Sequence, residues 1–198
     1  MGQNLVVAIS RQYGSGGRQI GMELAKRLGI PFYDKEFIAF AAQKSKVSEQ
    51  FFEQPEQNCM HPALWDIIPG VSYEAPLSDN VFLAQRSAIR ELGQRGACVI
   101  VGRGAGEALK DLVPVLNVFI HADMESRKQR AIKEYGDSPK QIEAHIIGID
   151  KKRASYYRFY TGLDGRKMEN YQLSLDSGAL GIDGAVEVIE MAYRWMGE

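Results

Sequence analysis

A glycine-rich segment near the start of the chain has the composition of a phosphate-binding loop. Gly14, Gly16 and Gly17 fall within four positions, and Arg18 follows them. Glycines let successive backbone N–H groups turn toward one anion, the dipole of a following helix favours negative charge, and an arginine adds a fixed positive charge. The pattern therefore predicts contacts to nucleotide phosphates from Gly14, Ser15, Gly16, Gly17, Arg18 and Gln19.

The segment departs from both standard glycine motifs for nucleotides. The dinucleotide motif G-x-G-x-x-G needs a glycine at position 19, where the chain has Gln19. The motif G-x-x-x-x-G-K-[ST] also fails when Gly17 is taken as its last glycine, because its lysine position then holds Arg18 and its first position Gln12. We expect Arg18 to supply the charge of the missing lysine. A purely structural turn between a strand and a helix is the alternative.

The elements around this loop alternate between strand and helix patterns. Apolar runs predict strands at residues 5–9, 98–101, 115–120 and 172–175, with a brief extended segment at 30–33. Helical spacing predicts helices at 20–28, 35–44, 80–93, 105–112, 124–135, 138–160 and 182–195. Strands that alternate with helices predict an α/β fold with a parallel sheet of about five strands and right-handed connections.

Asp34 follows the extended segment, at the edge of the sheet where α/β proteins bind ligands. A substrate or Mg²⁺ contact and a simple helix cap are both open for it. Arg103 lies in a glycine-rich turn directly after the strand at 98–101, and this position favours a functional role over a structural one. Residues 45–79 lose clear periodicity but keep prolines and aromatic residues, which is typical of a semi-irregular flap.

Composition limits the function classes further. The chain of 198 residues is long enough for one domain, and its net charge of −1 gives no general attraction to a nucleic acid polymer. No apolar run is long enough to span a membrane, and a cytoplasmic location is expected. The two cysteines and three histidines are scattered and form no metal-ligand pattern.

The chain resembles the cytidylate kinase-like branch of the P-loop nucleoside monophosphate kinases. The resemblance rests on Ile9–Gly21, on Pro31–Glu36 and on Val99–Gly104, and it continues in the following segments. These are Val118–Ala122 with Glu125, Arg127 and Arg130; Asp150–Arg153 with Tyr156 and Tyr157; Tyr160–Gly162; and Tyr171–Ser177.

The resemblance implies a three-layer P-loop fold with a flap that binds the monophosphate and a basic helical lid at about 124–160. It implies that Arg103 binds the acceptor phosphate, although Gly104 replaces the acidic residue that follows this arginine in cytidylate kinases. The lid arginines Arg127, Arg130 and Arg153 would neutralise the transferring phosphoryl group. For Asp150, a contact to the acceptor and an ion pair with a neighbouring basic residue are both open.

The leading hypothesis is transfer of a phosphoryl group from ATP, with Mg²⁺, to a nucleoside monophosphate, with CMP or dCMP as first candidates. Mg²⁺ would be held by nucleotide phosphates, water and an acidic residue, because the loop lacks the usual Ser/Thr ligand. Two alternatives stay open: a catalytically weak or inactive nucleotide-binding regulator, and a kinase of a non-nucleotide small molecule. The aromatic residues Tyr156, Tyr157, Phe159 and Tyr160 cannot all face one core, so some are expected on the flap or in a homodimer.

Overall fold

The computed structural model describes residues 4–35, 37–38 and 79–197, and within them it has a parallel sheet of five strands. The strand order is β2-β3-β1-β4-β5, so β1 (Val6–Arg11) lies at the centre. It pairs with β3 (Val99–Val101) on one side and with β4 (Val115–His121) on the other. The outer strands are β2 (Phe32–Tyr33) and β5 (Leu173–Asp176). The expected parallel α/β fold is confirmed.

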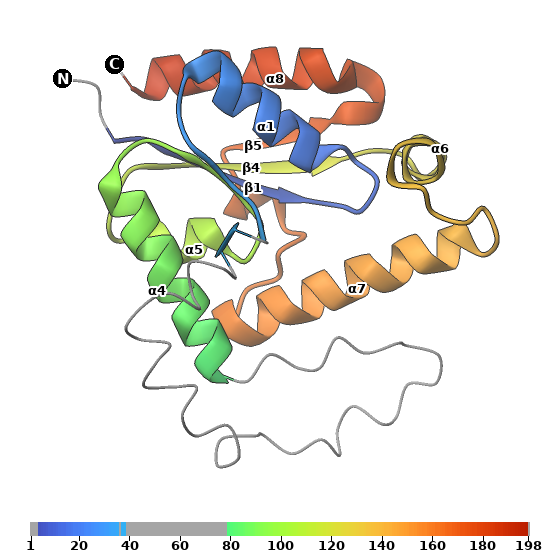
Figure 1. Cartoon of the computed structure of the whole chain (residues 1–198), viewed down its shortest axis with the longest axis horizontal. Helices are drawn as coiled ribbons and strands as arrows, with labels where there is room; N and C mark the ends of the chain where they lie inside the picture. Colours follow the sequence, from blue (N-terminus) through green and yellow to red (C-terminus); the bar gives the residue numbers. More distant parts are fainter. Residues whose placement is uncertain (1–3, 36, 39–78, 198) are drawn as a thin grey trace.

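Helices cover both faces of this sheet (Figure 1). Their bounds are α1 Gly17–Leu28, α4 Asp79–Arg95, α5 Ala105–Leu109, α6 Met124–Tyr135, α7 Ile142–Thr161 and α8 Ser177–Met196. A short 3-10 turn, Met168–Asn170, leads into β5. Figure 1 shows α1 and α8 together on one side of the sheet and α4 and α5 on the other.

The alternation of side chains along β1 divides the core between these two faces. Val7 and Ile9 pack with the apolar residues of α1 and α8, whereas Val6 and Ala8 pack with those of α4 and α5. All four side chains are buried, which is the pattern of a central strand in a parallel sheet. The carboxyl end of β1 is thereby held rigidly between its neighbours.

The first residues of α7 and α8 differ most from those expected. The lid helix α7 starts at Ile142 rather than at 138, because Gln141 has a left-handed backbone (φ 58°) that a helix cannot contain. In contrast, α8 starts at Ser177, five residues before the expected 182, because the Asp176 carboxylate accepts hydrogen bonds from the Gly178 and Ala179 amides. The helix is interrupted at Gly181 (φ 69°, ψ 179°), which explains why the periodicity becomes regular only after it.

The expected flap at residues 45–79 lies outside the described residues, except for Asp79, where α4 begins. Most of the helix expected at 35–44 lies outside them as well. Among the helices that the structure describes, none combines the length and the apolarity that a membrane crossing would require.

Candidate functional site

The glycine loop joins β1 to α1 at the carboxyl end of the sheet's central strand. Gln12 fastens its first part to β4: its amide donates to the Ile120 carbonyl at 3.0 Å, and its side-chain oxygen accepts from the Ala122 amide at 3.2 Å. The buried Ser15 hydroxyl then donates to the Gln12 carbonyl at 2.9 Å. The first residue of α8 completes the support, because the Ser177 hydroxyl contacts the Ser15 carbonyl at 2.6 Å.

Two glycines of the loop are required by its geometry. Gly14 and Gly16 have φ values of 78° and 75°, in the left-handed region that other residues rarely adopt. A Cβ on Gly14 would lie 2.5 Å from the Arg127 carbonyl oxygen, and one on Gly16 would lie 2.5 Å from Cδ1 of Ile182. Gly16 is the N-cap of α1, whose first turn contains no acidic residue. The helix dipole therefore presents its positive end at the loop without a competing carboxylate in that turn.

The structure also shows how the loop aligns with the phosphate-loop motif. Gly16 is the last residue of the loop with positive φ, and Gly17 is the first residue of α1. The motif's last glycine therefore corresponds to Gly16, one position earlier than the sequence analysis assumed. In this register Arg11 takes the place of the first glycine, Gly17 that of the lysine and Arg18 that of the Ser/Thr.

Arg18 lies beside Asp34. Its Nε and Nη2 atoms donate to one carboxylate oxygen of Asp34 at 3.0 and 2.7 Å, and 59% of its side chain is exposed. Asp34 also caps the next helix, because its other oxygen accepts from the Phe37 amide at 3.2 Å. The capping role of Asp34 is confirmed, and its role toward a substrate or Mg²⁺ stays a prediction.

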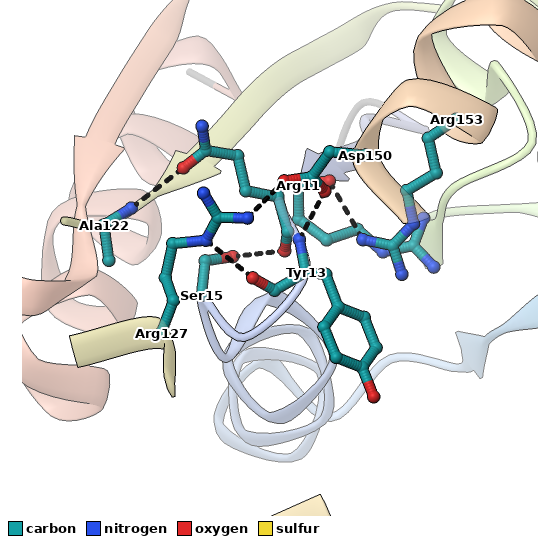
Figure 2. A network of polar contacts seen from close by, with 8 residues as sticks. Arg11, Tyr13, Ser15, Ala122, Arg127, Asp150 and Arg153 are labelled. Carbon is teal, nitrogen blue, oxygen red and sulfur yellow. Dashed lines mark hydrogen bonds and ion pairs between the residues drawn. The ribbon is translucent and has the colours of Figure 1, made fainter. Parts of the chain in front are cut away.

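The three lid arginines all donate to carbonyl oxygens of the loop. Arg127 Nε donates to the Tyr13 carbonyl at 2.7 Å (Figure 2), and Arg130 Nη1 donates to the Gly14 carbonyl at 2.8 Å. Arg153 Nη1 donates to the Arg11 carbonyl at 3.2 Å, and its guanidinium lies over the Tyr13 ring at 5.6 Å. Burial lowers the pKa of Arg153. These contacts from α6 and α7 hold the loop backbone in one conformation.

Asp150 neutralises part of this cluster. One carboxylate oxygen accepts from the Tyr13 amide at 2.7 Å, and the other forms an ion pair with Arg127 Nη2 (Figure 2). Only 6% of the Arg127 side chain is exposed, so the pair is largely removed from water. The ion-pair role that the sequence left open for Asp150 is thus present, and a contact to the acceptor stays a prediction.

Tyr13 extends the contact between loop and lid. Its hydroxyl donates to the Asp137 carboxylate at 2.8 Å, and its ring meets Tyr135 and His145 edge to face. Burial and the Asp137 carboxylate raise the pKa of Tyr13, so the hydroxyl stays protonated in the neutral range.

One buried donor at the loop has no hydrogen-bond acceptor within the described part of the chain. Arg130 Nε is buried without a hydrogen bond there, and its nearest carboxylate contact is Glu134 Oε1 at 3.7 Å. This nitrogen lies 3.3 Å from the position that a Cβ on Gly16 would take, at the N-terminus of α1. A buried guanidinium N–H without a hydrogen bond is rare in proteins and indicates a place for an anion or a water molecule.

The turn after β3 lies next to the loop, because β3 pairs with β1. Gly102, Arg103 and Gly104 all have left-handed backbone, with φ values of 90°, 57° and 65°. The Arg103 guanidinium lies 5.4 Å over the Tyr156 ring of α7. Burial raises the pKa of Tyr156, and the Arg103 charge partly offsets this. Arginine at position 103 carries a backbone strain that a glycine would avoid, which is typical of functional positions.

The aromatic residues at the end of α7 have different environments. The Tyr160 ring stacks on Phe82 of α4 at 3.7 Å, and Tyr156 meets the same Phe82 ring edge to face at 6.3 Å. Phe159 is 56% exposed. Tyr156 and Tyr160 therefore pack on α4. The expected packing on the flap falls outside the described residues, and the expected homodimer stays a prediction.

Of the predicted site residues, the structure brings together the glycine loop, Arg127, Arg130, Arg153 and Asp150. Arg18 of α1 pairs with Asp34, which follows β2, and Arg103 lies in the turn after β3. The sequence analysis assigned no role to Arg11, whose side chain lies against Gly17 and Gly102. The signal was present in the motif: the departures at positions 11 and 17 appear together once Gly16 is taken as the last glycine. The described residues contain no group of three or more His, Cys, Asp and Glu that could hold a metal.

Comparison with known proteins identifies both a family and a fold. The model of the cytidylate kinase-like family matches residues 6–179. No curated protein gave a significant match. Among solved structures, an uncharacterised protein from Eubacterium ventriosum is similar with a TM-score of 0.75 and 23% identity over 96% of this chain and 98% of that one.

Two shikimate kinases also share the fold. The enzyme from Bacteroides thetaiotaomicron has a TM-score of 0.54 and 15% identity, over 96% of this chain and 98% of its own. The enzyme from Acinetobacter baumannii, solved in complex with shikimate, has a TM-score of 0.51 and 15% identity, over 97% of this chain and 94% of its own. At these identities the likeness shows the three-layer P-loop kinase fold and no more.

Proposed function

The chain belongs to the cytidylate kinase-like family, and from this premise we propose that it transfers the γ-phosphoryl group of ATP to a nucleoside monophosphate. Family and fold support a phosphotransferase that acts on a nucleotide or another small molecule. CMP and dCMP are the first acceptors to test, because the family resemblance points to them.

The observation that carries this proposal is the anion site at the start of α1. The left-handed glycines 14 and 16 shape the loop, and the first turn of the helix contains no acidic residue. Arg130 Nε is a buried donor at this point without an acceptor among the described residues. A phosphate group there would accept hydrogen bonds from this donor and from the loop amides at the same time.

The proposed reaction forms a bond between the γ-phosphorus and a phosphate oxygen of the acceptor. The bond to the oxygen that bridges the β- and γ-phosphates breaks, and ADP leaves. Such a transfer needs positioning and charge stabilisation more than covalent chemistry. The loop from Gly14 to Gln19 would bind the donor phosphates, and Arg103 would bind the acceptor phosphate. Arg103 suits this role because it lies at the adjacent strand end, on a backbone fixed by two flanking glycines.

The lid arginines would act partly through the loop itself. Arg127, Arg130 and Arg153 hold loop carbonyls, and this fixes the direction of the intervening peptide groups. The carboxylates of Asp150 and Glu134 offset part of the charge of these arginines. Stabilisation of the phosphoryl charge in the transition state is therefore supported by preorganised charge near the loop.

ATP and Mg²⁺ are proposed as cofactors of this reaction. When bound, Mg²⁺ neutralises charge on the transferring phosphates. Asp34 is bound to Arg18 in the first turn of α1, and it would have to exchange this contact to reach the metal or a substrate. Nucleotide phosphates and water would supply the remaining ligands.

Transfer to a non-nucleotide acceptor is the second candidate, favoured by the fold shared with the two shikimate kinases. A nucleotide-binding regulator is the third, favoured by the loss of the motif's lysine and of the Ser/Thr that follows it.

A coupled assay decides among them. ADP release would be followed with ATP and Mg²⁺ against a panel of nucleoside monophosphates that includes CMP and dCMP, and against shikimate. Turnover with a monophosphate is expected. Turnover with shikimate alone would replace the acceptor, ATP binding without any turnover would support the regulator, and no ATP binding would refute the proposal.

A further inference from the structure

We propose that Arg11 supplies the positive charge that a lysine supplies in phosphate loops of standard sequence, and that residue 17 is glycine because Arg11 fills the space beside it. The inference rests on the proposed function, since it names the residue that contacts the donor phosphates at the same site.

The motif itself gives the first argument. With Gly16 as the last glycine, G-x-x-x-x-G-K has arginine at its first position and glycine at its lysine position. Two departures are present in these seven positions, and they are complementary: one adds a cation and the other removes one. Arg18, at the Ser/Thr position that follows, adds another cation, so Arg11 and Arg18 are the two candidates for the charge of the missing lysine.

The geometry at Gly17 gives the second argument. A Cβ on Gly17 would lie 2.7 Å from Cβ and 3.0 Å from Cγ of Arg11. Two Cβ atoms do not approach this closely. The backbone that carries them cannot easily move apart, because Arg11 belongs to β1 and residue 17 to α1. A lysine at position 17 and the side chain of Arg11 therefore exclude each other. Because Gly17 is helical, glycine is needed there for space and not for its backbone angles.

The far end of Arg11 gives the third argument. Its guanidinium lies against Gly102, so closely that a Cβ on Gly102 would overlap Nη1 and lie 3.0 Å from Cζ. The side chain thus runs from the end of β1, past the first residue of α1, to the turn after β3. This path places the charge between the loop proposed for the donor and the turn that carries Arg103. A cation in that position lies where charge moves from donor to acceptor.

Arg18 is less suited to this role in the structure. Its guanidinium already binds the Asp34 carboxylate through two nitrogens, and most of its side chain is in water. The Arg11 side chain is half-buried and lies against Gly17 and Gly102. Packing therefore places both its stem and its guanidinium beside the loop.

The first experiment compares ATP affinities by calorimetry, with and without Mg²⁺. The Arg11→Met variant keeps the stem that packs on Gly17 and loses the charge, and it is expected to bind ATP at least tenfold more weakly. Arg194→Met on the outer face of α8 is the matched control, since Arg194 pairs only with Glu190 among the ion pairs described, and unchanged affinity is expected. If Arg11→Met does not fold, Arg11→Lys is compared with Arg11→Gln. The lysine variant should then bind ATP at least tenfold more tightly than the glutamine variant.

The second experiment moves the charge back. Gly17→Lys alone should lose both stability and ATP affinity, because its Cβ meets Arg11. The double variant Arg11→Gly with Gly17→Lys restores the standard motif, and it should bind ATP at least tenfold more tightly than Arg11→Gly alone. A folded double variant without this recovery would contradict the inference.

The outcomes separate the two proposals. A wild-type chain that does not bind ATP refutes the proposed function. A wild-type chain that binds ATP, together with an Arg11→Met variant of equal affinity, overturns the assignment of Arg11 alone. Loss of affinity in Arg18→Ala, with Arg11→Met unchanged, would assign the charge to Arg18 instead.

Discussion

Two glycine turns leave adjacent parallel strands at the same edge of the sheet, and they are held in different ways. The turn after β1 is fixed by side chains from α6, α7 and α8, which bind its carbonyl groups at Arg11, Tyr13, Gly14 and Ser15. The turn after β3 has three successive residues with positive φ and is held by backbone hydrogen bonds, from the Gly102 amide to the Ile9 carbonyl at 2.9 Å and from the Ala105 amide to the Gly102 carbonyl at 3.3 Å. Its contacts to α7 are made by the faces of rings, such as Arg103 over Tyr156.

The difference matches the two tasks that the turns have in the proposed reaction. A donor loop that always binds the same triphosphate gains from a rigid shape set by many hydrogen bonds. A turn that presents one arginine to an acceptor needs only a fixed backbone beneath a side chain that can adjust. We therefore expect substitutions in the turn after β1 to lower both stability and activity. Substitutions in the turn after β3 should change one without a matching change in the other.

The largest difference is expected between Gly14→Ala and Gly104→Ala. Both positions have positive φ, so both variants lose about 1 kcal/mol from backbone strain. At Gly14 the added Cβ also meets the Arg127 carbonyl at 2.5 Å, whereas at Gly104 the nearest atom is Thr161 Cγ2 at 3.8 Å. Overpacking against backbone raises the total loss for Gly14→Ala to about 3 to 4 kcal/mol. Urea unfolding measures both, and equal losses would contradict the comparison.

Asp150→Ala tests whether the lid helices hold the turn after β1 in place. The change leaves Arg127, whose side chain is 6% exposed, without its carboxylate, and it leaves the Tyr13 amide without an acceptor. Removal of one partner from a buried ion pair is costly, and because Asp150 is 26% exposed we expect the lower end, about 3 kcal/mol in the free energy of unfolding.

Asp183→Ala is the control for this variant. Asp183 pairs with Arg27 at 3.2 Å but is 83% exposed, so its removal should change stability by less than about 0.5 kcal/mol. Similar losses for Asp150→Ala and Asp183→Ala would show that the lid does not fasten the loop.

Two substitutions of Arg103 should differ in stability but have the same effect on function. Arg103→Gly and Arg103→Ala both remove the cation over Tyr156, but only glycine relieves the φ of 57°. The glycine variant should therefore be about 1 kcal/mol more stable than the alanine variant in urea unfolding. Both should raise the KM of the acceptor at least tenfold and leave the affinity for ATP within about twofold, an amount below about 0.5 kcal/mol. A matching loss of ATP affinity would place Arg103 in the donor site.

Among the predicted site residues, the smallest effect on stability is expected for Arg18→Ala. Its ion pair with Asp34 is 2.7 Å long, but 59% of the arginine side chain is exposed, so solvent screens the pair. We expect a loss of less than about 1 kcal/mol in urea unfolding. A loss as large as that of Asp150→Ala would mean that Arg18 helps to hold the turn after β1 in place.

The sequence predicted those features that local rules determine. The glycine loop, the end of α1 at Leu28 and the alternating order of strands and helices follow from residues close together in the chain. The capping role of Asp34 follows from its position before a helix. The start of α7 was missed because nothing in the residue type of Gln141 requires a left-handed backbone.

The partners of the site residues could not be read from the sequence. Arg127 and Asp150 are 23 residues apart, and both reach Tyr13, which is more than 100 residues away from either. Composition marked the lid as basic, but only the folded chain shows that its arginines bind loop carbonyls. The role proposed for Arg11 was hidden by a register error of one residue, which the φ angle of Gly16 and the start of α1 at Gly17 resolve.

The exclusion between Arg11 and a side chain at position 17 has a consequence for how such loops can change over generations. A chain with Arg11 and a lysine at position 17 forces two Cβ atoms to within 2.7 Å, and a chain with glycine at both positions has no cation at either. Passage from one loop type to the other by single substitutions goes through one of these two states. Under the proposed role of Arg11, the first state would lose stability and the second would lose the cation. A motif search that demands the lysine would then pass over loops in which the strand supplies the charge.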